Sequence, residues 1–105
     1  MTKLSDTAFV ILLTLGQTPM GQLHGYGLLQ CAKTHTGMLL AVGALYTQLS
    51  QLLQNGLIEE IGHPEVNSRR REYRITELGR EACTQHATRL SLLATRILEW
   101  TGELA

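Results

Sequence analysis

The sequence predicts a mostly α-helical fold with a small β-hairpin, namely a winged helix-turn-helix followed by a C-terminal dimerisation helix. Three observations support this fold class. Residues 42–55 have an amphipathic helical pattern that stops at Asn55-Gly56, directly before an apolar strand pattern. A second strand pattern follows a turn, and residues 68–74 contain four arginines. Residues 77–101 then have one long helical pattern.

Length and charge limit the possible functions. The 105 residues fit one small domain, and a chain of this size buries a modest fraction of its surface, so an oligomer would enlarge its core. Nine basic and nine acidic residues give no net charge, which argues against a nonspecific nucleic-acid coat. The charges are unevenly distributed, however, because Lys33 is the only formally charged residue between positions 7 and 58.

The cysteines and the apolar segments indicate a soluble cytoplasmic protein. Cys31 and Cys83 form no CxxC pair and have helical neighbours, which is typical of reduced, buried thiols. The apolar run of residues 8–15 is too short to span a bilayer, and the N-terminus lacks the pattern of a signal peptide. We therefore expect no membrane association.

The histidines and carboxylates show no metal or catalytic pattern. No HxxxH or HExxH spacing occurs among the four histidines, and Asp6 is the only aspartate. The sequence also lacks a GxSxG motif, a glycine-rich phosphate loop after a strand, and a plausible catalytic triad. These patterns predict a protein that is not an enzyme and has no metal or other cofactor.

The first predicted helix covers residues 6–15, with Ser5 as its N-cap. One apolar stripe contains Leu4, Ala8, Ile11, Leu12 and Leu15. Phe9, Val10 and Leu13 lie outside this stripe, so the helix is apolar nearly all round and needs more than one partner. Because one small domain covers only one side of such a helix, we expect a second subunit on the other side.

Turn residues and periodicity predict the remaining elements. They are helices at residues 25–34 and 42–55, a short strand at 38–40, hairpin strands at 57–62 and 70–75, and a last helix at 77–101. Thr76 is a suitable cap for the last helix. Residues 1–76 are expected to be the winged helix-turn-helix domain, and residues 77–105 the dimerisation helix.

The last helix carries a heptad-like, mostly apolar seam, which predicts dimerisation. The seam consists of Cys83, Ala87, Leu90, Ala94, Ile97, Thr101 and Leu104. The helix is long and has no later element to pack against, which favours pairing with a second copy of the chain. The expected dimer interface contains Phe9, Leu13, Leu90, Ala94, Ile97 and Thr101.

On a helical wheel, residues 42–55 separate a core face from an uncharged outward face. The predicted core face contains Val42, Leu45, Leu49, Leu52 and Leu53. The outward face contains Gly43, Ala44, Thr47, Gln51 and Gln54, with Tyr46 and Gln48 flanking the two faces. A recognition helix presents such outward side chains to base edges, where glutamine pairs with adenine and a small side chain meets the thymine methyl group. A solvated helix without a ligand has the same pattern.

The hairpin of residues 57–75, called the wing below, carries the basic segment. The basic residues at or beside its turn are Arg69, Arg70, Arg71 and Arg74. Guanidinium groups suit phosphates and narrow minor grooves, and this charge run lies where a wing would touch the DNA backbone, although many charge runs are only solvated surfaces. Strand alternation places Tyr73 and Ile75 on the inner face and Glu72 on the outer face, where its charge would partly offset the arginines.

These segments resemble the PadR family of transcriptional regulators. The matching pieces are His24-Gly25-Tyr26-Gly27-Leu28-Leu29, then Leu45-Tyr46 followed by Leu49, Leu52 and Asn55-Gly56-Leu57-Ile58, and finally Arg69-Arg70-Arg71-Glu72-Tyr73-Arg74-Ile75-Thr76-Glu77-Leu78-Gly79. They occur in the family's order and spacing over residues 5–82, and the single last helix resembles the family's compact branch. The resemblance implies a homodimeric winged-helix repressor, often released from its operator by a small molecule.

The sequence departs from the family pattern in the recognition helix and the wing. Ala41-Val42-Gly43-Ala44 stands where the family usually has a serine or threonine, so a capping and phosphate-contacting hydroxyl is missing. The recognition helix has no lysine or arginine, Ser68 replaces a usual wing glycine, and Glu72 replaces a usual aromatic residue. Because each lost phosphate contact weakens binding and flattens its salt dependence, these departures concern affinity and operator choice.

Two aromatic residues each have two interpretations. The resemblance implies that the Tyr26 hydroxyl reaches a phosphate, and the alternative is a buried packing tyrosine. In some compact members similar to this chain, a tryptophan on the last helix stacks on flat drugs in a pore at the dimer centre. Trp100 lies one residue before the seam position Thr101, so it is the matching candidate. The alternative is that Trp100 packs in the interface or is partly exposed.

The sequence therefore predicts a homodimeric, sequence-specific repressor that binds double-stranded DNA. The candidate DNA-binding residues are Tyr26, Gly43, Ala44, Tyr46, Thr47, Gln48, Gln51, Arg69, Arg70 and Arg71. A two-fold dimer favours a pseudo-palindromic operator. A small planar effector bound at Trp100 would release the protein from that operator. Two alternatives remain open: a protein-interaction module of the same fold that has lost DNA binding, and a small-molecule sensor or carrier in which Trp100 is primary.

Overall fold

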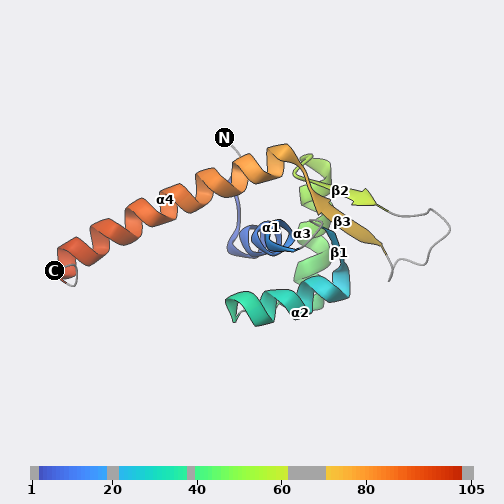
Figure 1. Ribbon diagram of the computed structural model, residues 1–105, viewed down its shortest axis with the longest axis horizontal. Helices are drawn as coiled ribbons and strands as arrows, with labels where there is room; N and C mark the ends of the chain where they lie inside the picture. The colour runs from blue at the N-terminus through green and yellow to red at the C-terminus, as the bar shows by residue number, and fades with distance from the viewer. Residues whose placement is uncertain (1–2, 19–21, 38–39, 62–70, 103–105) are drawn as a thin grey trace.

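A computed structural model describes residues 3–18, 22–37, 40–61 and 71–102 of the chain (Figure 1). Its elements in order are α1 (Asp6–Gln17), β1 (Gln22–His24), α2 (Gly25–Thr36), α3 (Val42–Gln54), β2 (Ile58–Ile61), β3 (Glu72–Ile75) and α4 (Glu77–Thr101). The predicted fold class is confirmed, since the fold is mostly helical with an antiparallel hairpin and a long C-terminal helix. Within the described residues, no helix is both long enough and apolar enough to cross a membrane.

The sheet has a third strand that the sequence did not predict. Its order is β1-β3-β2, and both pairings are antiparallel. The strand predicted at residues 38–40 is wrong at Leu40, which belongs to no strand, while positions 38 and 39 lie outside the described residues. Three residues are too few to show an alternating pattern, so β1 depends on its pairing with β3 rather than on a local signal.

Helix α1 occupies the centre of the core, between α2 and α4 (Figure 1). Its N-cap is Ser5, as predicted, because the Ser5 hydroxyl accepts a hydrogen bond from the backbone N–H of Ala8 at 3.1 Å. The predicted stripe is buried, with Ile11, Leu12 and Leu15 fully enclosed. Val10 was expected outside the core but is also buried by the chain itself, which leaves Phe9 and Leu13 as the partly exposed apolar residues of α1.

Helix α3 packs on this core through Leu45, Leu49 and Leu52, as its periodicity predicts. Val42 was predicted to lie on the core face, and this prediction is wrong because Val42 is 58% exposed. Val42 lines a cavity, together with Tyr46 and Tyr73, instead of packing in the core. The missing hydroxyl at the start of this helix has the expected consequence, since Ala41 makes no side-chain cap hydrogen bond.

Helix α4 begins on the body of the protein and then extends away from it (Figure 1). The Thr76 hydroxyl caps it by accepting from the N–H of Gly79 at 3.0 Å, and it also donates to the carbonyl of Gly56 at 2.7 Å. Gly79, Ala82 and His86 are the buried residues of the described helix, whereas every residue from 87 to 102 is exposed in the single chain. Within the described residues, the buried part of α4 is therefore confined to its first three turns.

Gly79 is expected to tolerate no side chain. A Cβ built there would lie 2.0 Å from the backbone carbonyl oxygen of Leu57, so the start of α4 would have to move away from the backbone of Leu57, which directly precedes β2. We expect Gly79→Ala to lower the free energy of unfolding by about 3 kcal/mol, measured by urea denaturation with circular dichroism.

Gly43 provides the matched control, because it also lies in the first turn of a helix and a Cβ there would meet nothing within 4 Å. Gly43→Ala should leave stability unchanged or raise it by up to about 1 kcal/mol. Equal effects of the two substitutions would contradict the packing of α4 described above.

Candidate nucleic-acid interface

The outward face of α3 is exposed and uncharged, as predicted. Its exposed members are Gly43, Ala44, Thr47, Gln51 and Gln54, while Gln48 is half-buried. Open space surrounds the Gly43 position, so a polymer backbone has room to approach the first turn of the helix closely. The face offers amide groups, one hydroxyl and small side chains, a combination that reads base edges but contributes no charge attraction.

Tyr46 has a structural role that the sequence did not reveal. Its ring lies against the start of α2, where a Cβ at Gly25 would come within 2.9 Å of the Tyr46 hydroxyl oxygen. The glycine in the segment His24-Gly25-Tyr26-Gly27 therefore allows α2 and α3 to approach each other closely. Tyr46 remains exposed enough to contact a ligand as well.

The N-terminal end of α2 presents Tyr26 to solvent. Tyr26 is 63% exposed, so the alternative of a buried packing tyrosine is wrong. Its hydroxyl accepts a hydrogen bond from the Gln30 side-chain amide at 3.0 Å, which still leaves the hydroxyl proton available to another acceptor. His24 caps this helix through its Nδ1 atom, which accepts from the N–H of Gly27 at 3.0 Å.

In the described part of the wing, two arginines are paired with carboxylates on the neighbouring strand. Arg71 Nε lies 3.1 Å from Glu60 Oε1, and Arg74 Nε donates to Glu59 Oε1 at 2.8 Å. The sequence analysis did not single out these glutamates, although the strand register places Glu59 directly opposite Arg74. Both pairs are largely exposed, so each is worth at most about 1 kcal/mol. Phosphates would compete for these arginines.

Not every predicted wing residue can be placed. Arg69 and Arg70 lie outside the described residues. Tyr73 and Ile75 point inward and are buried, as strand alternation predicts. Burial raises the pKa of Tyr73 above its ordinary value of 10.0, and the charge of Glu60 raises it further, while Arg71 acts in the opposite direction.

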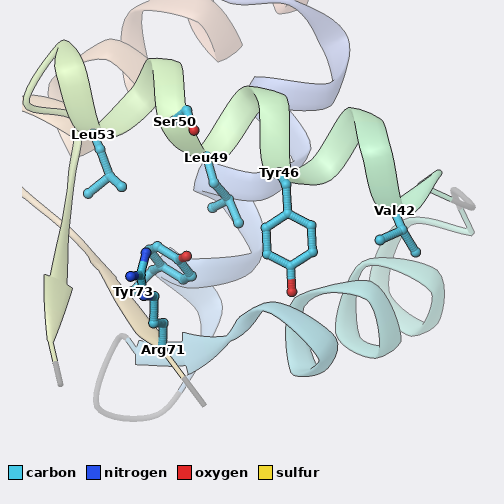
Figure 2. Close-up of a pocket in the computed structure, with 7 residues that line it drawn as sticks. All are labelled: Val42, Tyr46, Leu49, Ser50, Leu53, Arg71 and Tyr73. Carbon is cyan, nitrogen blue, oxygen red and sulfur yellow. The ribbon is translucent and has the colours of Figure 1, made fainter. Parts of the chain in front are cut away.

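A cavity of about 500 Å³ separates α3 from the start of β3 (Figure 2). It is lined by Val42, Tyr46, Leu49, Ser50, Leu53, Arg71 and Tyr73. Because residues of α3 and Arg71, which directly precedes β3, line the same cavity, α3 and the described part of the wing are direct neighbours.

The predicted dimer and ligand residues lie on α1 and along α4. Leu90, Ala94, Ile97 and Thr101 are all exposed in the single chain, and Trp100 is 84% exposed. Phe9 packs against His86, with ring centroids 4.6 Å apart. His86 is a buried residue that sequence reasoning missed, and its Nε2 atom has no hydrogen-bond partner among the described residues.

Other chemistry is sparse in the described residues. Cys31 and Cys83 are half-buried free thiols, and burial raises the pKa of Cys83, which disfavours the reactive thiolate. The described part of the chain contains no cluster of three or more His, Cys, Asp or Glu side chains arranged to hold a metal ion.

A helix packed beside a hairpin that carries arginines, with the polar face of the helix exposed, is the arrangement of a winged-helix protein. The model of the transcriptional regulator PadR-like family matches residues 11–85. The chain therefore belongs to the PadR-like family of transcriptional regulators. No curated protein matches the chain significantly.

Solved structures agree on the fold. A transcriptional regulator from Clostridium thermocellum is 24% identical with a TM-score of 0.75, over 92% of this chain and 97% of that chain. A PadR family transcription regulator from hypervirulent Clostridium difficile is 15% identical with a TM-score of 0.73, over 92% and 98%. F93 from STIV, a winged-helix DNA-binding protein, is 17% identical with a TM-score of 0.69, over 85% and 91%.

The raised pKa of Tyr73 has a consequence at alkaline pH. The folded state favours the neutral phenol, so this contribution to stability is fully present below pH 10.0 and is lost as the pH rises through the folded-state pKa. We expect the free energy of unfolding, measured in urea, to fall less steeply between about pH 9 and pH 11 in Tyr73→Phe than in the unmodified protein. An unchanged profile for Tyr73→Phe would contradict this assignment.

Proposed function

We propose that the chain is a homodimeric, sequence-specific DNA-binding transcriptional repressor. One observation carries the proposal: α3, whose polar face is exposed, lies directly beside the hairpin, because other residues of α3 line the same cavity as Arg71, which directly precedes β3 (Figure 2). This is the arrangement in which a helix enters the major groove while the wing contacts the backbone. Membership of a family of transcriptional regulators supports the same function.

In this proposal, recognition and charge attraction come from different elements. The bases are read by Thr47, Gln48 and Gln51, with Gly43, Ala44 and Tyr46 close to the DNA at the same helix. Arg69, Arg70 and Arg71 supply the phosphate contacts, together with the exposed hydroxyl of Tyr26. The first N–H groups of α3 have no side-chain cap from Ala41, so they suit a phosphate as well.

Dimerisation is assigned to α4, with residues 1–76 as the DNA-binding unit and residues 77–105 as the dimerisation helix. Leu90, Ala94, Ile97 and Thr101 would meet the partner copy, joined by Phe9 and Leu13 of α1. The exposed apolar side chains along the described part of α4 beyond residue 86 support this assignment. A two-fold dimer would bind a pseudo-palindromic operator with half-sites about 34 Å apart.

Release by a small planar effector is part of the same proposal. Trp100 is exposed beside the proposed interface, where an aromatic face is available for stacking. An effector bound there would act by binding more tightly to dimers with one separation of the two DNA-binding units. The size of its effect would depend on the difference between its affinities for the two states of the dimer. Quenching of Trp100 fluorescence by planar compounds tests this step separately from DNA binding.

The second candidate function is a winged-helix protein-interaction module. The pairing of Arg71 and Arg74 with glutamates favours it, because it reduces the positive charge next to an uncharged helix. In that case a protein partner, rather than DNA, would bind the face that contains Thr47 and Gln51.

The Arg71–Glu60 pair provides a test in which two substitutions are expected to change DNA affinity in opposite directions. Arg71→Gln should weaken DNA binding and lower the slope of log K against log salt by about 0.9, since one phosphate contact is lost. Glu60→Gln should tighten binding by up to about fivefold, because the arginine no longer has a competing carboxylate. Fluorescence anisotropy between about 50 and 200 mM salt measures both values. Indifference of DNA affinity to both substitutions would favour the interaction module.

The oligomer is tested with two leucine-sized residues that are equally exposed. Ile97, on the seam, is 55% exposed, and Leu92, on the opposite side of α4, is 54% exposed. In sedimentation velocity, the unmodified chain is expected at twice 11.6 kDa. Ile97→Glu should sediment as a monomer and Leu92→Glu as a dimer. A dimeric Ile97→Glu variant would place the interface elsewhere.

A further inference from the structure

The cavity between α3 and β3 has the size of a small-molecule site. Its volume of about 500 Å³ falls within the range of roughly 300–1,000 Å³ that such sites occupy. Its walls are mainly apolar or aromatic, from Val42, Leu49 and Leu53 and the rings of two tyrosines (Figure 2). No residue of α4 lines it, so it is separate from Trp100.

Two side chains of the apolar wall are partly exposed to solvent. Val42 and Tyr46 are both exposed although they belong to a helix whose neighbouring face is fully buried. The open side of α3 therefore continues the hydrophobic face of the helix into the cavity. A flat apolar ligand would cover this surface and remove it from water, which is the main source of affinity in such sites.

Polar groups converge on the same space. The hydroxyls of Tyr46, Ser50 and Tyr73 and the guanidinium of Arg71 belong to lining residues, and no hydrogen bond joins these three hydroxyls to another described residue. Tyr46 is near enough to contribute to the raised pKa of Tyr73. These groups can all donate hydrogen bonds, so a bound molecule needs an acceptor atom.

The charges favour an uncharged ligand over an anion. Arg71 already has a carboxylate partner, since its Nε lies 3.1 Å from Glu60. At the Tyr73 hydroxyl, the negative charge of Glu60 has a larger effect than the positive charge of Arg71. Because Arg71 is already paired with Glu60, an anion would gain little net charge attraction at this end of the cavity, whereas a carbonyl oxygen accepts a hydrogen bond without bringing a charge that has to leave water.

We propose that this cavity binds a small, flat, uncharged apolar molecule with an oxygen acceptor, held between α3 and the start of β3. The molecule lies against Tyr46 and Arg71. If the proposed DNA-binding function holds, on which this consequence rests, an occupied cavity weakens DNA binding directly at the recognition helix, without any change in the dimer.

The test is a titration of the full chain with 2-acetylnaphthalene, followed by two-dimensional 15N NMR. Saturable shifts are expected at the amides of Tyr46 and Ser50. The near-isosteric anion 2-naphthoate is expected to bind at least about tenfold more weakly. Ser50→Phe and, independently, Val42→Trp should abolish binding by filling the cavity. Gln54→Phe is the control, because it introduces the same ring as Ser50→Phe but on the outward face of the helix. It should leave binding intact.

Several results would overturn the proposal. These are shifts centred on Trp100 and α4, binding that survives both cavity-filling substitutions in folded variants, equal affinity for 2-naphthoate, and no saturable binding up to the solubility limit. DNA is then titrated with and without 2-acetylnaphthalene. Failure to bind DNA at all would refute the proposed function, while the NMR result would still decide whether the cavity is a ligand site.

Discussion

The position of α1 in the centre of the core is the constraint on which the other elements depend. This helix packs against α2, α3, α4, β1 and β3, and Ile11, Leu12 and Leu15 have no exposed surface. Close-packed interiors deform little, so one rigid helix fixes both the direction of α3 and the direction in which α4 leaves the body. If operator recognition and dimerisation occur as proposed, both therefore depend on the position of α1.

Electrostatics imposes the second constraint. The chain has no net charge, α3 has no charged residue, and the two described wing arginines are each paired with a glutamate. Long-range attraction to a polyanion is consequently weak. Affinity must then come from two sources. The uncharged side chains make close contacts with bases, and phosphates replace the exposed glutamate carboxylates as partners of the wing arginines. Such a protein would gain selectivity relative to nonspecific binding.

Local signals were enough to predict the helices. Ser5 and Thr76 act as the predicted caps, the leucines of α3 point inward as their spacing requires, and α4 ends at Thr101 as expected. These features depend on neighbours within a few residues in the sequence. Strand alternation likewise placed Tyr73 and Ile75 in the core.

The features that were missed depend on contacts between distant segments. β1 exists through its pairing with β3, and the glutamate partners of Arg71 and Arg74 follow from the hairpin register. The exposure of Val42 reflects a cavity, and the need for glycine at position 25 reflects the ring of Tyr46. Hydrophobic periodicity describes one helix or strand at a time, so it contains no information on contacts between residues of different elements. For the same reason, the sequence gives the residue types of the candidate interface but not their pairing.

The central claim is sequence-selective DNA binding, and it is tested most directly with DNA from upstream of the protein's own gene. Fluorescence anisotropy at two salt concentrations, with nonspecific competitor DNA present, measures both affinity and selectivity. The account expects selective binding that weakens as salt rises. Absence of selective binding at the lower salt concentration would contradict the account and leave the protein-interaction module as the function of this fold.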